Sequence, residues 1–225
     1  LSTEIVSNLL DKPDGLDMGG TLQTVTILMA DIRGFTTISE QLSPQSVVKL
    51  LNNYLGGMAD IIMAHGGIVD EFIGDAILAL FGAPVTSQQD RENAIRCALA
   101  MQEAMHTVNL RNEAEGLPAI EMGIGLNTGE VVAGNIGSST RAKYGVVGHA
   151  VNLTSRIEDQ TGRGEILAAA STLQGTELEL KLGRELDLQP KGVSERVRVS
   201  QIIQIIEPVP AERSNDEPQQ NKEAK

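Results

Sequence analysis

The sequence has a single cysteine, Cys97, among 225 residues, so no disulfide bond can form within the chain. Free thiols persist in reducing compartments, and we therefore expect a cytoplasmic location. No apolar run approaches the ~20 residues that a membrane-spanning helix needs. The first residues, LSTEIVSNLLDKPDG, lack a basic region followed by an apolar one, so we expect no signal peptide.

Positive charge is also scarce, because 18 Lys and Arg residues face 30 Asp and Glu residues, for a net charge of −12. This balance argues against a nucleic-acid backbone or an anionic membrane as the main partner. A mononucleotide stays compatible with it, since bound divalent cations can reverse the sign of the charge at a local site. The length and the hydrophobic fraction of 41% are ordinary for one sizeable core, or at most two small ones.

Several common site patterns are missing. The histidines His65, His106 and His149 do not have the spacing of zinc ligands, which disfavours a zinc site. The glycines of GIGLNTGEVVAGNIG (123–137) match neither GxGxxG nor GxxxxGKS/T, so a dinucleotide-binding fold and a P-loop are rejected. We instead expect these glycines at hairpin and bulge positions.

Breakers and the spacing of apolar residues divide the chain into strands and helices. The run TVTILMADI (24–32) predicts a buried strand, and helical spacing predicts a helix from Ser43-Pro44 to Gly66-Gly67. The later elements are expected to be a hairpin about Gly74-Asp75, a helix over 89–111, a hairpin over 119–137 that turns at 127–129, a helix after Gly148, and short strands around a helical turn over 165–206. This order predicts an antiparallel or mixed sheet with helices on one face. We expect residues 1–20 to be a linker, 21–207 one folded domain and 208–225 a disordered tail.

Three acids, Asp70, Glu71 and Asp75, lie within six positions of an almost wholly apolar stretch, GGIVDEFIGDAILALF, which is a costly setting for carboxylates. Asp31 ends a predicted strand and Asp75 lies on a predicted turn. If these strands are neighbours, the two carboxylates meet at one edge of the sheet and need a hard divalent cation between them. Two magnesium ions held this way would suit chemistry on a polyphosphate. The alternative is that Asp31 caps a helix and Asp75 only makes a turn.

Three further segments could contact a phosphorylated substrate. After Asp31, a turn and a helix start at Phe35 and Thr36 offer backbone N–H groups to phosphates. Asn152 and Arg156 are four residues apart and share a helix face, which suits an anionic transition state, although an exposed capping pair would look the same. Lys191 precedes a glycine in a loop, where it could reach a terminal phosphate or simply lie on the solvated surface.

Four segments together carry a family resemblance: MADIRGFT (29–36), EFIGDA (71–76), GLNTGEVVAGNIG (125–137) and GHAVNLTSR (148–156). In this order, within residues 22–206, they are similar to class III nucleotide cyclase catalytic domains, and most closely to the bacterial and cyanobacterial homodimeric members. The resemblance implies a catalytic domain over 21–207 with an α+β fold, a ferredoxin-like βαββαβ core with an extra hairpin and helices. It also implies attack of the ribose 3′-oxygen on the α-phosphorus, with release of pyrophosphate.

The resemblance assigns roles residue by residue. Asp31 and Asp75 would hold two Mg²⁺ or Mn²⁺ ions, with the Ile32 carbonyl as a further ligand. Asn152 would orient the ribose, Arg156 would stabilise the pentavalent phosphorus and Lys191 would bind the triphosphate. His149 departs from the family, which usually has an acid or an amide there, and we expect only a local effect. Asp70 has no family role and is expected to be structural.

Two positions decide the expected base. Glu71 occupies a position that is usually lysine in enzymes using ATP, and its carboxylate can accept hydrogen bonds from both N1–H and N2–H₂ of guanine. Gly145 stands where adenylate cyclases usually have aspartate or threonine, and its missing side chain leaves room for the guanine O6. The resemblance thus favours a guanylate cyclase acting on GTP. An adenylate cyclase and a catalytically inactive dimerisation module remain as alternatives, the latter disfavoured because all four of Asp31, Asp75, Asn152 and Arg156 are present.

The resemblance also implies a homodimer with composite sites. One protomer would give Asp31 and Asp75, and the other would give Glu71, Asn152, Arg156 and Lys191. Because the chain begins in a linker-like segment, we expect upstream regulatory domains in the full-length protein.

Overall fold

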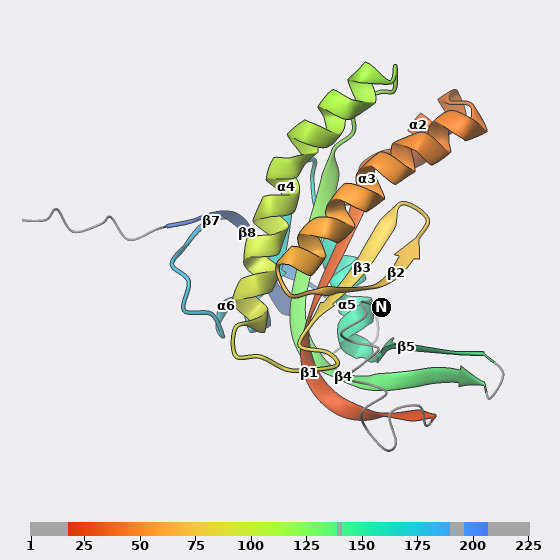
Figure 1. The fold of residues 1–225 in the computed structure, drawn as a ribbon. Helices are drawn as coiled ribbons and strands as arrows, with labels where there is room; N and C mark the ends of the chain where they lie inside the picture. The colour runs from red at the N-terminus through yellow and green to blue at the C-terminus, as the bar shows by residue number, and fades with distance from the viewer. Residues whose placement is uncertain (1–17, 139–140, 190–195, 207–225) are drawn as a thin grey trace, which may run out of the picture.

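The structure, a computed structural model, describes residues 18–138, 141–189 and 196–206 (Figure 1). In chain order its elements are β1 (Gly19–Ile32), α2 (Phe35–Gln41), α3 (Pro44–Ala64), β2 (Ile68–Ile73), β3 (Ala76–Phe81), α4 (Asp90–Ala114), β4 (Met122–Ser138), β5 (Arg141–Val147), α5 (His149–Glu158), β6 (Ile166–Ala169), α6 (Ala170–Leu173), β7 (Leu180–Leu188) and β8 (Val197–Ile205). Within these residues, no helix has both the length and the apolar character needed to cross a membrane. The expected tail over 208–225 lies outside the described residues.

The described strands form one mixed sheet, which confirms the predicted α+β class. Its order is β2-β3-β1-β4-β6-β8-β7, and β5 pairs with the far end of β4. The segment β1-α3-β2-β3-α4-β4 is the expected βαββαβ core. Antiparallel pairing of β1 with β3, up to Ala30 opposite Ile77, places the end of β1 beside the β2–β3 turn.

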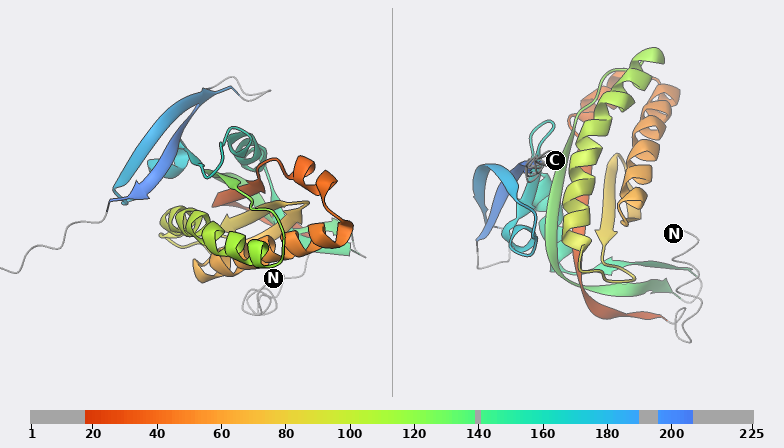
Figure 2. Two further views of the ribbon diagram at one scale, coloured as in Figure 1. Left: turned by 90° about the horizontal axis from the view of Figure 1, so that it is seen from above. Right: turned by 60° about the vertical axis from the view of Figure 1, so that its left-hand side comes forward.

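Helices cover both faces of this sheet, so the expectation of helices on one face was wrong (Figure 2). Leu28, Ala30 and Ile32 of β1 belong to the core cluster that includes the buried residues of α3 and α4. The alternate residues of β1, Ile27 and Met29, pack in a second cluster that includes Ala150 of α5. Because alternate side chains of a strand point to opposite faces, α5 lies on the face opposite α3 and α4.

Helix α3 follows the sequence signals closely. The hydroxyl of Ser43 accepts a hydrogen bond from the backbone N–H of Ser46 at 3.2 Å, and Pro44 occupies the first helical position. Its buried residues Leu50, Tyr54, Met58 and Ile62 recur every four positions, as an amphipathic helix requires. The helix ends before Gly66, whose φ of 75° is the left-handed conformation that glycine tolerates best.

The predicted hairpin over 119–137 is wrong, because β4 continues through 127–129 as one strand. It pairs with β1 from Ile32 opposite Met122 to Gly19 opposite Asn135, and this long ladder overrides the local turn signal. Strand β1 correspondingly starts at Gly19 and not at residue 24, so Gly19 and Gly20 belong to the sheet and not to a linker. Of the rest of that expected linker, Met18 is described, and residues 1–17 lie outside the described part of the chain.

Two glycines of β4 allow α5 to approach the sheet and do not form a turn. A Cβ atom on Gly125 would lie 2.7 Å from the backbone nitrogen of Glu158. A Cβ atom on Gly123 would collide with the side chain of Thr161. These glycines therefore fix the position of the carboxyl end of α5 over β4.

Candidate active site

Asp31 and Asp75 lie together where β1 ends beside the β2–β3 turn. The backbone N–H of Ile32 donates to Asp75 Oδ2 at 3.3 Å. Burial, a side-chain hydrogen bond with Asp31 and the negative charge of Asp31 raise the pKa of Asp75 to about 7. The helix that follows is capped by Gly34 without a side-chain hydrogen bond, so Asp31 does not cap it.

This pair of carboxylates has the chemistry of a site for a hard divalent cation. Two acids within hydrogen-bonding distance repel when both are ionised, and a cation between them removes that cost. Among the described residues there is no group of three or more His, Cys, Asp or Glu side chains that could hold a metal ion. Asp31, Asp75 and the Ile32 carbonyl would therefore share a cation with phosphate and water oxygens, which is how Mg²⁺ is commonly bound.

Arg33 and Glu158 form an ion pair directly beside Asp31. Arg33 Nη2 lies 3.5 Å from Asp31 Oδ2 and also contacts Glu158 Oε1, while Nη1 donates to the Thr161 carbonyl at 3.4 Å. The side chains of Arg33 and Glu158 are only 18% and 5% exposed. Neither residue has a role in the family resemblance, and the only local signal in the sequence is a cation two positions after Asp31.

Tyr54 of α3 lies buried beneath the acid pair. Its hydroxyl donates to Met122 Sδ at 3.6 Å. Burial, together with the charges of Asp31 and Asp75, raises the pKa of Tyr54 far above its usual value, so the phenol stays protonated. In the sequence, Tyr54 looks like one more position on the apolar face of this helix.

The start of α2 follows the acid pair directly. Gly34 adopts a φ of 76°, and the first backbone hydrogen bond of the helix runs from Ile38 N–H to the Gly34 carbonyl at 3.2 Å. The N–H groups of the first turn have no partners within a helix, and those of Phe35 and Thr36 are in this turn. The Phe35 ring packs against the core, whereas Thr36 is exposed.

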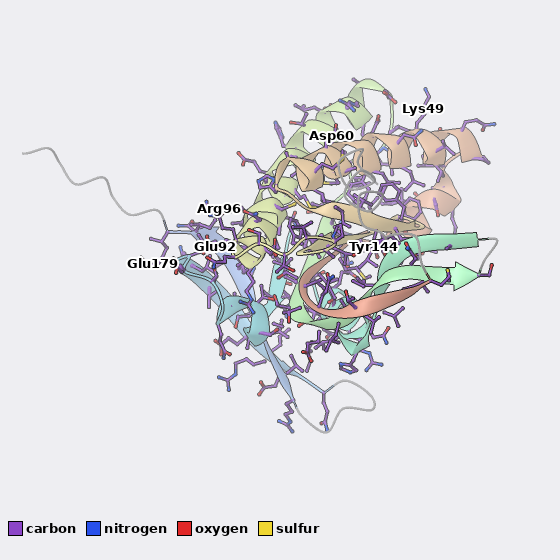
Figure 3. The ribbon with its side chains drawn as sticks, turned by 60° about the horizontal axis from the view of Figure 1, so that its bottom comes forward. Lys49, Asp60, Glu92, Arg96, Tyr144 and Glu179 are labelled. Atoms are coloured by element: carbon purple, nitrogen blue, oxygen red, sulfur yellow. The ribbon has the colours of Figure 1, made fainter. Side chains whose placement is uncertain are left out.

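The two expected base-reading positions lie close together although they are far apart in the sequence. Lys143 of β5 donates to Glu71 Oε2 at 2.8 Å, and Lys143 is two residues from Gly145. A Cβ atom on Gly145 would lie 3.0 Å from Asp70 Oδ1. Tyr144, the residue between Lys143 and Gly145 in β5, is labelled in Figure 3. Glu71 of β2 and Gly145 of β5 therefore lie near each other on neighbouring parts of the sheet, with Lys143 beside them. No sequence pattern pointed to Lys143.

Asp70 and Glu71 differ sharply in their environments. The Asp70 side chain is 4% exposed, and burial raises its pKa, whereas the Glu71 side chain is 49% exposed. A register shift in β2 between Val69 and Glu71 allows both acids to approach Lys143, at 3.9 Å and 2.8 Å respectively. The hydrogen bond with Glu71 raises the pKa of Lys143.

Asn152 and Arg156 lie on the side of α5 that faces away from the sheet. Asn152 is exposed and Arg156 is half-buried, while Leu153 and Ile157 pack against the sheet. The predicted common face is therefore present. The helix begins at Gly148 without a side-chain cap, so neither residue caps its amino end. Lys191 lies outside the described residues.

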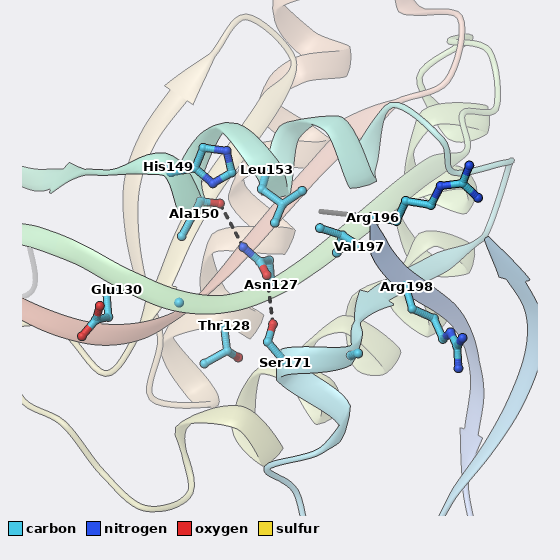
Figure 4. A pocket seen from close by; sticks show the side chains of 12 residues that line it. Asn127, Thr128, Glu130, His149, Ala150, Leu153, Ser171, Arg196, Val197 and Arg198 are labelled. Atoms are coloured by element: carbon cyan, nitrogen blue, oxygen red, sulfur yellow. Dashed lines mark hydrogen bonds between the residues drawn. The ribbon is translucent and has the colours of Figure 1, made fainter. Parts of the chain in front are cut away.

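A cavity of about 400 Å³ lies between β4, α6 and the starts of α5 and β8 (Figure 4). Asn127 forms its centre, donating to the Ala150 carbonyl at 3.1 Å and accepting from Ser171 Oγ at 3.1 Å. His149 and Arg196 line its edge. The polar residues that looked like a turn in the sequence are therefore buried hydrogen-bonding partners.

Comparison with known proteins gives one consistent family. A family model described as "Adenylate and Guanylate cyclase catalytic domain" matches residues 19–200. The crystal structure of the guanylyl cyclase Cya2 has a TM-score of 0.82 and 50% identity, covering 85% of this chain and 97% of that one. The adenylyl cyclase CyaB from P. aeruginosa has a TM-score of 0.76 and 33% identity, covering 82% and 95%. Adenylate cyclase 1 of Rhizobium meliloti (strain 1021) is 40% identical over 136 residues, which are 60% of this chain and 20% of that protein.

Proposed function

Because the chain belongs to the adenylate and guanylate cyclase catalytic domain family, we propose that it is a guanylate cyclase that converts GTP to 3′,5′-cyclic GMP and pyrophosphate. The observation that carries the choice of base is the half-exposed Glu71 carboxylate, which pairs with Lys143, whose Cε would lie 3.5 Å from a Cβ atom on Gly145. Guanine presents N1–H and N2–H₂ as adjacent donors, and one carboxylate can accept from both. Adenine presents an unprotonated N1 at the same edge, which a carboxylate repels.

Gly145 supports the same choice. A residue that reads adenine must accept a hydrogen bond from its exocyclic amino group, and glycine has no side chain to do so. The likeness to the guanylyl cyclase Cya2, at 50% identity, agrees with this reading. The names of CyaB and of the Rhizobium protein support a second candidate, an adenylate cyclase.

The chemistry we propose is an intramolecular displacement. The ribose 3′-oxygen loses its proton and bonds to the α-phosphorus, and the bond from that phosphorus to the bridging oxygen of the β-phosphate breaks. Asp31, Asp75 and the Ile32 carbonyl would hold two Mg²⁺ or Mn²⁺ ions, which supply charge neutralisation and activation of the 3′-oxygen when bound.

The other side chains would bind and orient the nucleotide. Asn152 would orient the ribose, and the guanidinium of Arg156 would stabilise charge on the pentavalent phosphorus. The N–H groups of Phe35 and Thr36 would bind phosphate oxygens, and Lys191 would bind the terminal phosphates.

We further propose that the active unit is a homodimer with composite sites. Following the family resemblance, one protomer would give Asp31 and Asp75 to a site, and its partner would give Glu71, Asn152, Arg156 and Lys191, so that Glu71 and Asp75 of one short hairpin serve two sites. Exposed apolar side chains also need a cover: Leu22, Val132 and Val147 lie in register on β1, β4 and β5 and are 66%, 43% and 58% exposed.

The proposal is tested by product analysis. Purified protein is incubated with Mn²⁺ and either GTP or ATP, and the cyclic nucleotide and pyrophosphate are quantified by chromatography. We expect cyclic GMP and pyrophosphate in equal amounts, and loss of both in Asp31→Ala. More efficient formation of cyclic AMP would favour the adenylate cyclase, and no product from either nucleotide would favour an inactive module.

A further inference from the structure

We propose that Arg33 and Glu158 act as a positioning pair for the metal-binding carboxylate of Asp31, in which Glu158 keeps the Arg33 guanidinium from competing with the cation. This inference rests on the proposed function, because it takes Asp31 as a metal ligand. It adds two residues to which the family resemblance assigned no role.

The geometry places one guanidinium nitrogen between two carboxylates. Arg33 Nη2 lies 3.5 Å from Asp31 Oδ2 and also contacts Glu158 Oε1. Asp31 is the more exposed of the two acids, at 34% against 5% for Glu158. The buried acid therefore takes most of the positive charge, and the exposed acid keeps its oxygens accessible from the site.

Glu158 is held firmly enough to do this. It is the last residue of α5, and its backbone packs so closely on β4 that only glycine fits at position 125. Thr161 Oγ1 donates to the Glu158 carbonyl at 2.7 Å, and the Thr161 carbonyl accepts from Arg33 Nη1 at 3.4 Å. Arg33 is thus held by Glu158, the last residue of α5, and by Thr161 in the segment that follows, and both contacts oppose its movement toward Asp31.

Electrostatics gives the sign of the effect. If Glu158 loses its charge, the guanidinium of Arg33 remains largely buried, and Asp31 is the acid that is left to pair with it. A partly buried cation without its partner is costly, so Arg33 shifts toward Asp31. A cation that approaches the metal site then has to displace it. Removing both charges together leaves Asp31 free again.

The test measures metal binding directly. Free Mn²⁺ is followed by electron paramagnetic resonance in the presence of a non-cyclisable GTP analogue, for wild type, Glu158→Gln and the double variant Arg33→Met/Glu158→Gln. We expect Mn²⁺ to bind about tenfold more weakly in Glu158→Gln, because an unpaired cation now faces the ligand acid. We expect the double variant to bind within about threefold of wild type.

A control removes a partly buried carboxylate away from the acid pair. Asp90, at the start of α4, accepts a hydrogen bond from the Ser87 backbone N–H at 2.7 Å and lies next to Gly82, which also approaches the Thr24 carbonyl of β1. Asp90→Asn should leave Mn²⁺ binding within about twofold, so it separates loss of stability from loss of metal binding. Thermal unfolding of each variant identifies the folded samples. If Glu158→Gln does not fold, Glu158→Asp takes its place, because the shorter carboxylate also loosens its hold on the Arg33 guanidinium, and the same weakening of Mn²⁺ binding with recovery in the double variant is required.

The outcomes separate the two proposals. Unchanged Mn²⁺ binding in Glu158→Gln, or binding in the double variant as weak as in the single one, overturns the positioning pair. Mn²⁺ binding that is unaffected by Asp31→Asn overturns the metal site of the proposed function itself, and the pair with it. Tenfold weakening with recovery in the double variant supports both.

Discussion

Replacing Glu71 with lysine is expected to remove most use of GTP, for two reasons that the structure supplies. The new ammonium would face the N1–H donor of guanine, which is left without an acceptor. It would also meet Lys143, whose ammonium lies 2.8 Å from the Glu71 carboxylate in the wild type. The substitution thus converts an ion pair into a repulsive pair of cations.

The magnitude follows from these two terms. Two unit charges about 4 Å apart repel by ~1 kcal/mol in water and ~4 kcal/mol at an effective dielectric constant of 20. The side chains of Glu71 and Lys143 are 49% and 51% exposed, so the lower figure applies. Unpaired donors in a recognition site cost up to ~10⁴-fold, and less in an open one. Together we expect kcat/KM for GTP to fall about 10²-fold.

The assay is steady-state formation of cyclic GMP and cyclic AMP with saturating Mn²⁺. Glu113→Lys, at an exposed position of α4, is the control for an added positive charge and should leave both efficiencies within about twofold. Adding Lys143→Met to Glu71→Lys removes the repulsion and should raise ATP use about fivefold over the single variant. Adding Gly145→Thr as well supplies an acceptor for adenine, although Asp70 has to shift to admit its Cβ atom. Efficiency with GTP that stays within threefold of wild type in Glu71→Lys would refute this reasoning.

Three other predictions address the metal site, the dimer and pH. Asp31→Ala should remain folded by thermal unfolding but lose turnover by more than about 10³-fold, because the metals neutralise the phosphates; turnover within a few-fold of wild type would place the metal site elsewhere. Mixing Asp31→Ala with Arg156→Ala chains should restore activity, since one of the two sites in the heterodimer is intact, and no recovery in chains shown to exchange would count against composite sites. The hydrogen bonds from Arg184 lower the pKa of Glu165, so the stability that this pair gives is present above the ordinary glutamate pKa and is lost as the pH falls through the lowered value. The melting temperatures of wild type and Glu165→Gln should therefore differ at pH 6, still differ at about pH 4 and converge only at lower pH, and convergence already at about pH 4 would contradict the lowered pKa.

The sequence predicted those parts of the fold that depend on residues close together in the chain. Helix α3 has its capping serine, its proline and its apolar spacing within one segment, and the structure confirms its bounds. The turn predicted at 127–129 failed because Asn127 and Thr128 look like turn residues locally. In the fold Asn127 is satisfied by Ala150 and Ser171, and Thr128 is hydrogen-bonded to Thr26 and Thr172. Such partners from distant elements cannot be read from a local pattern.

The same distinction applies to the site. Asp31 and Asp75 could be placed together because one ends a strand and the other lies on the turn of a hairpin, and strand pairing joins them. The pairing of Lys143 with Glu71, 72 residues away, has no counterpart in the sequence pattern. The ion pair of Arg33 with Glu158 depends on two glycines that admit α5 to the sheet, and this packing appears only in three dimensions.

The central claim is the choice of GTP, and direct competition tests it most simply. The purified protein is given equal concentrations of GTP and ATP with Mn²⁺, and both cyclic products are measured at low conversion, so that their ratio equals the ratio of the two kcat/KM values. We expect at least about tenfold more cyclic GMP than cyclic AMP, because the Glu71 carboxylate can accept from two guanine donors. An excess of cyclic AMP would contradict it.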